Sequence, residues 1–388
     1  MLLFERLIEQ FQAALTILKR TPGWVALRPA PIGAALALCV STNGAWAQVG
    51  QRHLQVGTLD VTMTYPTAAI ARPQALGSFN LQVAMGAEPL EQQHRLVVIS
   101  HGSVGNPVAD HALANKLAQA GFVVAQQLHE GDNFRDRRWA GPEAFRQRPT
   151  EAMRVVEALS KDPLWSSRLA LDKVGVHGMS AGGVTGIALA GGQWRLLNLV
   201  RHCNDHAQAD EGFCFQGAKE GEARAHRQAN HDRARGMPEW LLPSELKTLH
   251  GGKTPLAAPP ESGFDPRPDP RVAAVSLAVP VAAIFSPESL ARIRIPVGVV
   301  SADRDEVLVP RFHTDHLLRH CSTCTRLANL SGAGHFDVLW PWPDAVARAV
   351  GAQQVRGGLP VPGFDARQRD GAHDRIVAFH RQHLLPLP

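Results

Sequence analysis

From about residue 50 onward, segments with strand-like and helix-like patterns of apolar residues alternate along the chain. Short runs rich in β-branched residues, bounded by turn signals, are typical of strands. Between them lie longer segments with apolar residues at helical spacing. Strands are predicted at 59–66, 94–102, 122–129 and 171–178, and helices at 110–121, 148–161 and 180–192.

Strand signals stop in the middle of the chain and resume toward its end. Residues 193–270 are polar and then proline-rich, so we expect an inserted, lid-like segment there. Three more strands are predicted at 271–280, 294–302 and 325–334, followed by a last helix at 372–385. The β-α-β-α order predicts an α/β fold, with a doubly wound, mostly parallel sheet covered by helices on both faces.

The N-terminal region has the features of a secretory signal peptide. Arg28 precedes the apolar run at 31–40, and Ala45-Trp46-Ala47 offers a small-x-small cleavage site. We therefore expect cleavage after Ala47, a catalytic domain over 48–388 and a periplasmic or extracellular protein. Residues 1–27 make the charged region long for a signal peptide. We expect a true start downstream, near Val25; the alternative is a membrane-surface helix over residues 2–20.

The composition and charge of the chain argue against binding to nucleic acid and against a membrane-spanning segment. The 388 residues are 45% hydrophobic with a formal charge of +5, and the basic residues are scattered rather than clustered. This distribution argues against a nucleic-acid partner. No stretch is long and apolar enough for an ordinary transmembrane helix. The charge and hydrophobicity are those of a globular protein.

Four cysteines follow the expected cleavage site. An even number in an exported chain favours disulfides. Proximity along the sequence suggests the pairs Cys203–Cys214 and Cys321–Cys324, although four cysteines allow three pairings.

Two clusters of histidine and cysteine also invite a zinc interpretation. They comprise His313, His316, His320, Cys321 and Cys324, and then His202, Cys203, His206 and Cys214. Export disfavours thiolate zinc sites, so we expect a solvated helix followed by a short disulfide loop at the first cluster. The same reasoning disfavours zinc at the second cluster, and we expect no metal or cofactor.

The stretch Gly178-Met179-Ser180-Ala181-Gly182 fits the pattern G-x-S-x-G. It lies between a predicted strand and a predicted helix, where a nucleophile elbow presents a serine at the carboxyl edge of a sheet. The alternative is a glycine-rich phosphate-binding turn. The Lys-Ser/Thr pair of a P-loop is missing, which favours a nucleophilic Ser180.

A nucleophilic serine needs a base and an acid that orients the base, in the chain order Ser, acid, His. His335 follows the last predicted strand and is the candidate base, with Asp305 as the acid and Asp303 as the second choice. The N–H of Ala181 and that of Ser103 are the candidate oxyanion donors. His101, far upstream of the serine, is expected to be structural.

These motifs resemble those of the α/β-hydrolase superfamily, and more narrowly those of predicted dienelactone hydrolases related to platelet-activating-factor acetylhydrolases. The resemblance runs from about residue 55 to the C-terminus. It rests on YP (65–66), VVISHGSVG (97–105), HEGDN (129–133), RPTEAMRVVEAL (148–159), VGVHGMSAGG (174–183), DPRV (269–272), SADRDEVLVP (301–310) and GAGHF (332–336).

The resemblance implies a triad of Ser180, Asp305 and His335, with oxyanion donors at Ala181 and Ser103. Dienelactone hydrolases proper carry a cysteine nucleophile, so the serine favours a general carboxylic-ester hydrolase that acts on a small-molecule or lipid ester through an acyl-enzyme. The alternatives are a serine peptidase of the same fold and an inactive binding protein on a hydrolase scaffold.

Overall fold

The computed structural model describes residues 48–76, 79–215, 225, 268–339, 343–344, 347–348 and 359–386. The expected signal peptide at 1–47 lies outside these residues, as does most of the 193–270 insert. Within the described part, no helix has the length and apolar character needed to cross a membrane.

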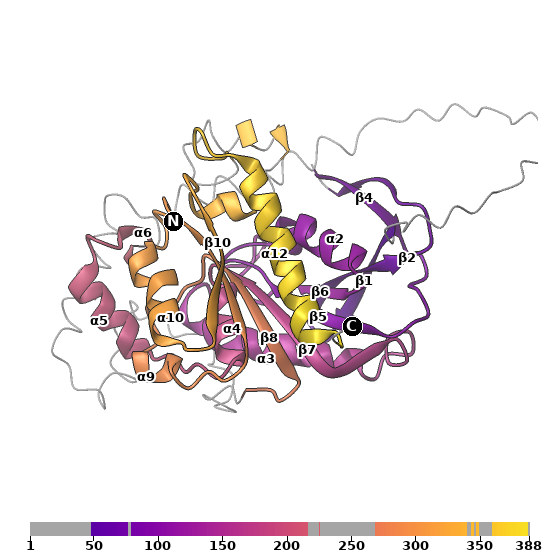
Figure 1. Cartoon of the computed structure of the whole chain (residues 1–388), viewed down its shortest axis with the longest axis horizontal. Helices are drawn as coiled ribbons and strands as arrows, with labels where there is room; N and C mark the ends of the chain where they lie inside the picture. Colours follow the sequence, from indigo (N-terminus) through magenta and orange to yellow (C-terminus); the bar gives the residue numbers. More distant parts are fainter. Residues whose placement is uncertain are drawn as a thin grey trace, which may run out of the picture.

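One ten-stranded sheet forms the centre of the molecule, in the order β10-β9-β8-β7-β5-β6-β2-β1-β4-β3 (Figure 1). From β10 to β6 all neighbours are parallel, whereas β2 joins β6 and β1 in antiparallel register. The predicted mostly parallel sheet is confirmed. The strands are β1 Gln48–Val56, β2 Leu59–Thr67, β3 Arg72–Leu76, β4 Phe79–Met85, β5 His94–Ser100, β6 Val123–Gln127, β7 Leu169–Met179, β8 Val272–Ala278, β9 Val297–Ala302 and β10 Cys324–Leu330.

All seven predicted strands are present, and three further strands were not predicted. β1, β3 and β4 lie together at one end of the sheet. β3 is almost entirely exposed, and β1 alternates with polar residues over its second half. Strands with so little buried apolar surface give a weak periodic signal.

Helices and 3-10 turns connect the strands. They are η1 Pro107–Asp110, α2 His111–Gln119, α3 Pro142–Leu159, α4 Gly182–Leu189, α5 Leu196–His206, α6 Glu211–Cys214, α9 Pro287–Leu290, η2 Pro310–Phe312, α10 Thr314–His320, η3 His335–Val338 and α12 Ala366–Leu384. Two predicted helix starts were wrong. α3 begins at Pro142 rather than 148, with Pro149 in its interior, and α12 begins at Ala366 rather than 372, where the Asp365 side chain caps it.

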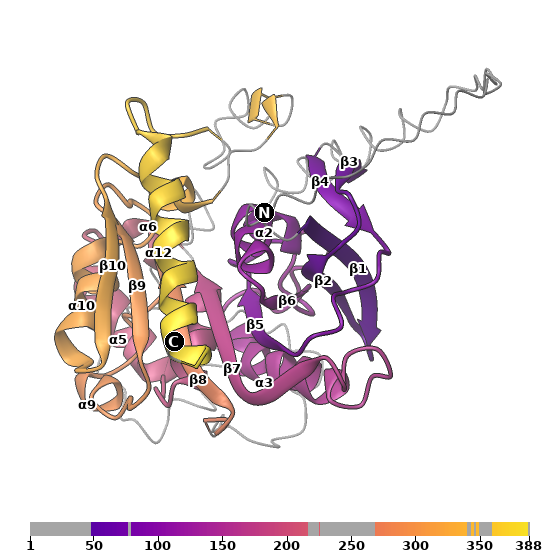
Figure 2. The same cartoon turned by 45° about the vertical axis from the view of Figure 1, so that its right-hand side comes forward.

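Helices cover both faces of the sheet, as the sequence predicts. The buried residues of α3, α4 and α10 pack in one apolar cluster, and those of α2 and α12 in a second. Figure 2 shows α12, in yellow, in front of the sheet between β9 and β7, and it packs mainly on β8 and β10. In β5, Leu96 and Val98 join the first cluster while Val97 and Ile99 join the second. Burial of both faces explains the continuous apolar run of this strand.

Parallel strands place all the candidate site residues at one edge. Ser103 follows β5, Ser180 follows β7, Asp305 follows β9 and His335 follows β10. Because these strands are parallel, their carboxyl ends meet at the same edge of the sheet, where ligands bind in open α/β folds.

A buried carboxyl group at the start of α2 has a consequence for stability. Asp110 is buried, and its Oδ2 atom has no hydrogen-bond partner among the described residues. Burial raises the pKa of Asp110 to about 7. Since burial disfavours the carboxylate, Asp110 costs no stability below about pH 4, where it is protonated in both the folded and the unfolded chain. The free energy of unfolding then decreases as the pH rises through about 7, because the unfolded chain ionises more readily.

We expect Asp110→Asn to leave the free energy of unfolding almost unchanged at pH 4 and to raise it by on the order of 3 kcal/mol at pH 8. Urea unfolding at the two pH values measures the difference. Asp205→Asn, on the exposed side of α5, is the control and should show no such pH dependence. Equal effects of Asp110→Asn at both pH values would contradict the expectation.

Candidate active site

Ser180 stands in a strained turn between β7 and α4. Its φ is 55°, in the left-handed region that residues other than glycine rarely adopt. Its N–H donates to the carbonyl of Ala278, and its own carbonyl accepts from Gly183 and Val281. These bonds hold a sharp strand-to-helix turn of the kind that exposes a nucleophile.

Two glycines make this turn sterically possible. A Cβ atom on Gly178 would lie 2.1 Å from the carbonyl oxygen of Gly182, and one on Gly182 would lie 1.9 Å from that of Ser100. Both obstacles are backbone atoms, which cannot rotate away as a side chain can. The two glycines of the G-x-S-x-G pattern are therefore a packing requirement of the elbow.

The structure brings Ser180, His335 and Asp305 together. His335 Nε2 lies 2.9 Å from Ser180 Oγ, and His335 Nδ1 lies 2.7 Å from Asp305 Oδ2. Asp305 is itself oriented, because its Oδ1 accepts hydrogen bonds from the N–H groups of Val307 and Leu308 at 2.9 and 2.8 Å. Both Asp305 and His335 are buried. This arrangement can draw a proton from the serine hydroxyl as it attacks a carbonyl carbon.

Asp303, the second choice for the acid, has a different place. Its side chain is exposed and accepts hydrogen bonds from the N–H of Gly332 at 2.7 Å and the hydroxyl of Ser331 at 3.2 Å. Asp303 thus shapes the loop before His335 without bonding to the imidazole.

The loop after β5 lies against the elbow. A Cβ atom on Gly102 would approach Ser180 Cβ to 3.4 Å and Met179 Sδ to 3.0 Å. Within the described residues, the N–H groups of Ser103 and Ala181 donate no hydrogen bond to the chain. Both groups are available to a ligand beside Ser180, as an oxyanion site requires.

His101 is structural, as the sequence suggests. It is fully buried, its Nδ1 lies 2.7 Å from the carbonyl of Gly102, and its Nε2 accepts the N–H of His129. Burial, followed by the neighbouring His129 ring and the guanidinium of Arg148, lowers the pKa of His101 well below its usual range. A neutral ring with both nitrogens occupied does not act as a base.

A cluster of two histidines and an aspartate, whose contacts no sequence pattern predicts, supports the loop that carries the acid. Asp210 Oδ2 accepts hydrogen bonds from His202 Nε2 at 2.7 Å and His313 Nε2 at 2.9 Å, while its Oδ1 accepts the N–H of Val309. A Cβ atom on Gly212 would lie 2.2 Å from the carbonyl of Glu306, so α6 packs directly on this loop. The segment α5–α6 therefore supports the turn that carries Asp305.

The expectation of a solvated helix at 313–320 was wrong for its first histidine. His313 precedes α10 and is completely buried against Asp210. Helical spacing places His313, His316 and His320 on one face, so the pattern alone does not separate the buried histidine from the other two.

His202, Asp210 and His313 are close enough together to hold a metal ion, but their hydrogen bonds do not suit one. His313 Nδ1 accepts the N–H of Ala282 at 3.1 Å, so the ring proton of neutral His313 is on Nε2, where it points at Asp210. A metal ion at Nε2 would require the opposite tautomer, with Nδ1 as the donor. The cluster is therefore a hydrogen-bonded support rather than a metal site.

The cysteines pair as proximity along the sequence suggests. Cys203 bonds to Cys214, which closes α5 onto α6, and Cys321 bonds to Cys324 at the start of β10. Both pairs are disulfides, so none of these sulfurs is available as a thiolate ligand.

The similarity of this chain to known proteins lies in its fold. The sequence matches no protein-family profile and no curated protein. Among solved structures, it is similar to a ferulic acid esterase from Streptomyces cinnamoneus, with a TM-score of 0.52 and 18% sequence identity over 90% of this chain and 94% of that one. Together with the strand order and the elbow after β7, this similarity shows that the chain has an α/β-hydrolase fold.

Proposed function

We propose that the protein is a serine carboxylic-ester hydrolase that acts through an acyl-enzyme on Ser180. The continuous hydrogen-bonded path from Ser180 Oγ through His335 to Asp305 carries this proposal. The similarity to a ferulic acid esterase and the resemblance to dienelactone and platelet-activating-factor hydrolases support the same reaction class.

The residues suggest a two-step reaction. His335 takes the proton of Ser180 as the hydroxyl oxygen attacks the ester carbonyl, and Asp305 stabilises the imidazolium that results. The N–H groups of Ser103 and Ala181 bind the oxyanion. His335 then protonates the leaving alcohol, and a water molecule activated by the same imidazole hydrolyses the acyl-enzyme.

A panel of substrates tests the proposal. The panel contains p-nitrophenyl esters from acetate to palmitate, methyl ferulate, a lactone and a short peptide p-nitroanilide. We expect turnover of at least one ester class and little cleavage of the anilide. Cleavage of the anilide at a rate equal to that of the esters would favour the peptidase alternative. An absence of turnover across the panel would favour a binding protein on a hydrolase scaffold.

The proposed location is outside the cytoplasm. The two disulfides are compatible with an oxidising compartment. Expression of the full chain in a bacterial host, followed by fractionation and N-terminal sequencing, should give a mature chain that begins at Gln48. A cytoplasmic product with an uncut N-terminus would contradict the assignment.

The Cys203–Cys214 disulfide should matter for both stability and turnover. It closes an 11-residue separation, and a loop of that size contributes about 3 kcal/mol to the free energy of unfolding. Cys203→Ser/Cys214→Ser should lose about this amount in urea unfolding and several-fold in kcat, because α5–α6 supports the loop of Asp305.

Cys321→Ser/Cys324→Ser is the matched control. This disulfide lies at the amino end of β10, opposite the candidate active site, so its removal should lower stability and leave kcat within about twofold. Equal losses of kcat in the two double variants would contradict a specific role for the α5–α6 segment.

A further inference from the structure

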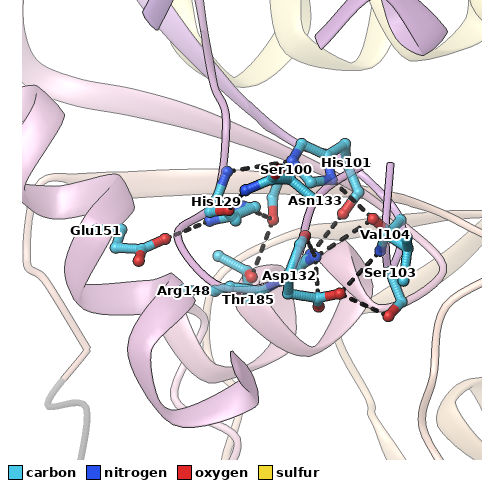
Figure 3. A network of polar contacts seen from close by, with 11 residues as sticks. Ser100, His101, Ser103, Val104, His129, Asp132, Asn133, Arg148, Glu151 and Thr185 are labelled. Atoms are coloured by element: carbon cyan, nitrogen blue, oxygen red, sulfur yellow. Dashed lines mark hydrogen bonds and ion pairs between the residues drawn. The ribbon is translucent and has the colours of Figure 1, made fainter. Parts of the chain in front are cut away.

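A buried ion pair lies beside the loop that carries Ser103 (Figure 3). Arg148, on α3, and Asp132, in the loop after β6, approach to 2.7 Å, and their side chains are 1% and 0% exposed. The proposed acyl transfer uses neither residue. Burying two charges is costly unless their remaining hydrogen-bonding groups are also satisfied, so the bonds of this pair show what it holds in place.

Asp132 fixes the two residues beside the oxyanion position. Its Oδ1 accepts the N–H of Val104 and the hydroxyl of Ser103, both at 2.8 Å. Val104 has a φ of 58°, a strained conformation for a β-branched residue, which the surrounding contacts must maintain. With the N–H of Val104 committed to Asp132, the neighbouring N–H of Ser103 is the one left for a ligand.

Arg148 fixes the other side of the same loop. Its guanidinium donates to the carbonyl of His101 at 2.5 Å, to that of Gly102 at 3.3 Å, and to the backbone and carboxylate of Asp132. A planar guanidinium can make these bonds together, whereas a lysine ammonium cannot reproduce the fork. Although burial opposes ionisation of Asp132, Arg148 and the bonds from Ser103 and Val104 hold its pKa below the usual range.

A third set of contacts anchors the base of the loop. Ser100 Oγ lies 2.7 Å from His129 Nε2, and His129 Nδ1 lies 2.6 Å from Glu151 Oε2. The order Ser, His, acid resembles that around Ser180, but these three side chains are buried and the Ser100 hydroxyl also bonds to Thr185. A substrate has no access to it, so this set is structural. Its link to the loop is the N–H of His129, which donates to His101.

We propose that Asp132 and Arg148 are positioning residues that hold the Ser103 N–H toward the oxyanion of the reaction. The proposal rests on the proposed ester hydrolase function. Ala181 needs no such support, since the elbow and α4 fix its N–H, whereas Ser103 belongs to a loop without regular structure. Preorganised donors act mainly on the transition state, so loss of this support should lower kcat rather than raise KM.

The first test removes the whole pair. Asp132→Leu/Arg148→Met leaves no unpaired charge in the interior, and exchanges of this kind are often tolerated. We expect kcat to fall by about 100-fold and KM to change by less than about threefold, since one oxyanion donor is worth this much. Affinity for phenylboronic acid, which forms a tetrahedral adduct with serine, should fall with kcat/KM. A wild-type kcat, or a rise in KM alone, would overturn the proposal.

The matched control is Asp269→Leu/Arg271→Met. This ion pair is at the amino end of β8, away from the loop, and the same substitutions there should leave kcat within about twofold. A loss of kcat equal to that of the Asp132/Arg148 variant would mean that ion-pair loss acts through stability alone.

Milder variants keep the test valid if the double variant does not fold. Ser103→Ala removes one bond to Asp132 at an exposed position, and we expect a threefold to tenfold loss of kcat with an unchanged Tm. Arg148→Lys keeps the charge and should lose about tenfold. Wild-type kcat in both variants would overturn the proposal.

Amide exchange of Val104, followed by NMR, does not depend on any substrate. In the wild type the Val104 amide should be protected by at least tenfold relative to that of Ser103, and Arg148→Lys should reduce this ratio. An unprotected Val104 amide in the wild type would overturn the support by Asp132, even if the esterase activity is real. Conversely, protection without ester turnover would leave the loop support intact and contradict the proposed function alone.

Discussion

Ser180→Ala will lower kcat for ester hydrolysis by roughly 10⁴- to 10⁶-fold. The hydroxyl oxygen is the atom that would form the acyl-enzyme, and His335 Nε2 lies 2.9 Å from it. Alanine keeps the backbone of the elbow, including the N–H of Ala181, so the variant should fold and bind substrate with a similar KM. Steady-state kinetics on the best ester of the panel measures the loss.

Ser167→Ala, at an exposed position after α3, is the control and should have the wild-type kcat. Mass spectrometry after treatment with a fluorophosphonate should show one adduct, on Ser180, and none in the Ser180→Ala variant. Retention of more than about 1% of the activity by Ser180→Ala would mean that another group is the nucleophile.

Asp305→Asn and Asp303→Asn should differ by at least 100-fold in kcat. Asp305 contacts His335 Nδ1 at 2.7 Å, and an amide there favours the wrong imidazole tautomer, a change that costs up to about 10⁴-fold in serine hydrolases. Asp303 bonds only to the loop before His335, so Asp303→Asn should lose less than about fivefold.

The two aspartates are a matched pair, because they lie two residues apart in one turn and receive the same substitution. Rates measured from pH 5 to 9 will show whether Asp305→Asn acts on the imidazole, since it should also change the pH dependence of kcat/KM. A larger loss at Asp303 would reverse the assignment of the acid.

The centre of the fold could be predicted because buried parallel strands produce unbroken apolar runs. β5 and the second half of β7, from Val174 onward, are examples, and the turns that follow them supply Ser103 and Ser180. β1 and β3 could not be predicted in the same way, since polar side chains interrupt them at the far end of the sheet. Their place depends on pairing with β2 and β4, which a local pattern does not reveal.

The sequence allowed the candidate residues at each strand end to be predicted, but not the contacts between residues from different segments. Asp303 and Asp305 share one turn, and only the direction of their side chains separates them. The stretch HEGDN (129–133) and the arginine before Pro149 were visible in the sequence, but no local pattern predicts the contact between Asp132 and Arg148, which are 16 residues apart. Likewise, His313 joins Asp210 across 103 residues, a contact that no spacing rule reports.

The two glycines of the elbow are needed for folding, independently of any catalytic activity. Gly178 and Gly182 are required because their neighbours are backbone atoms within about 2 Å of any added Cβ, and this crowding exists whether or not Ser180 reacts. A descendant that lost its chemistry would exchange Ser180, Asp305 or His335 freely, yet it would keep both glycines for as long as it folded. The two glycines thus indicate the fold that a chain inherited, whereas the three polar side chains indicate whether that chain still catalyses the reaction.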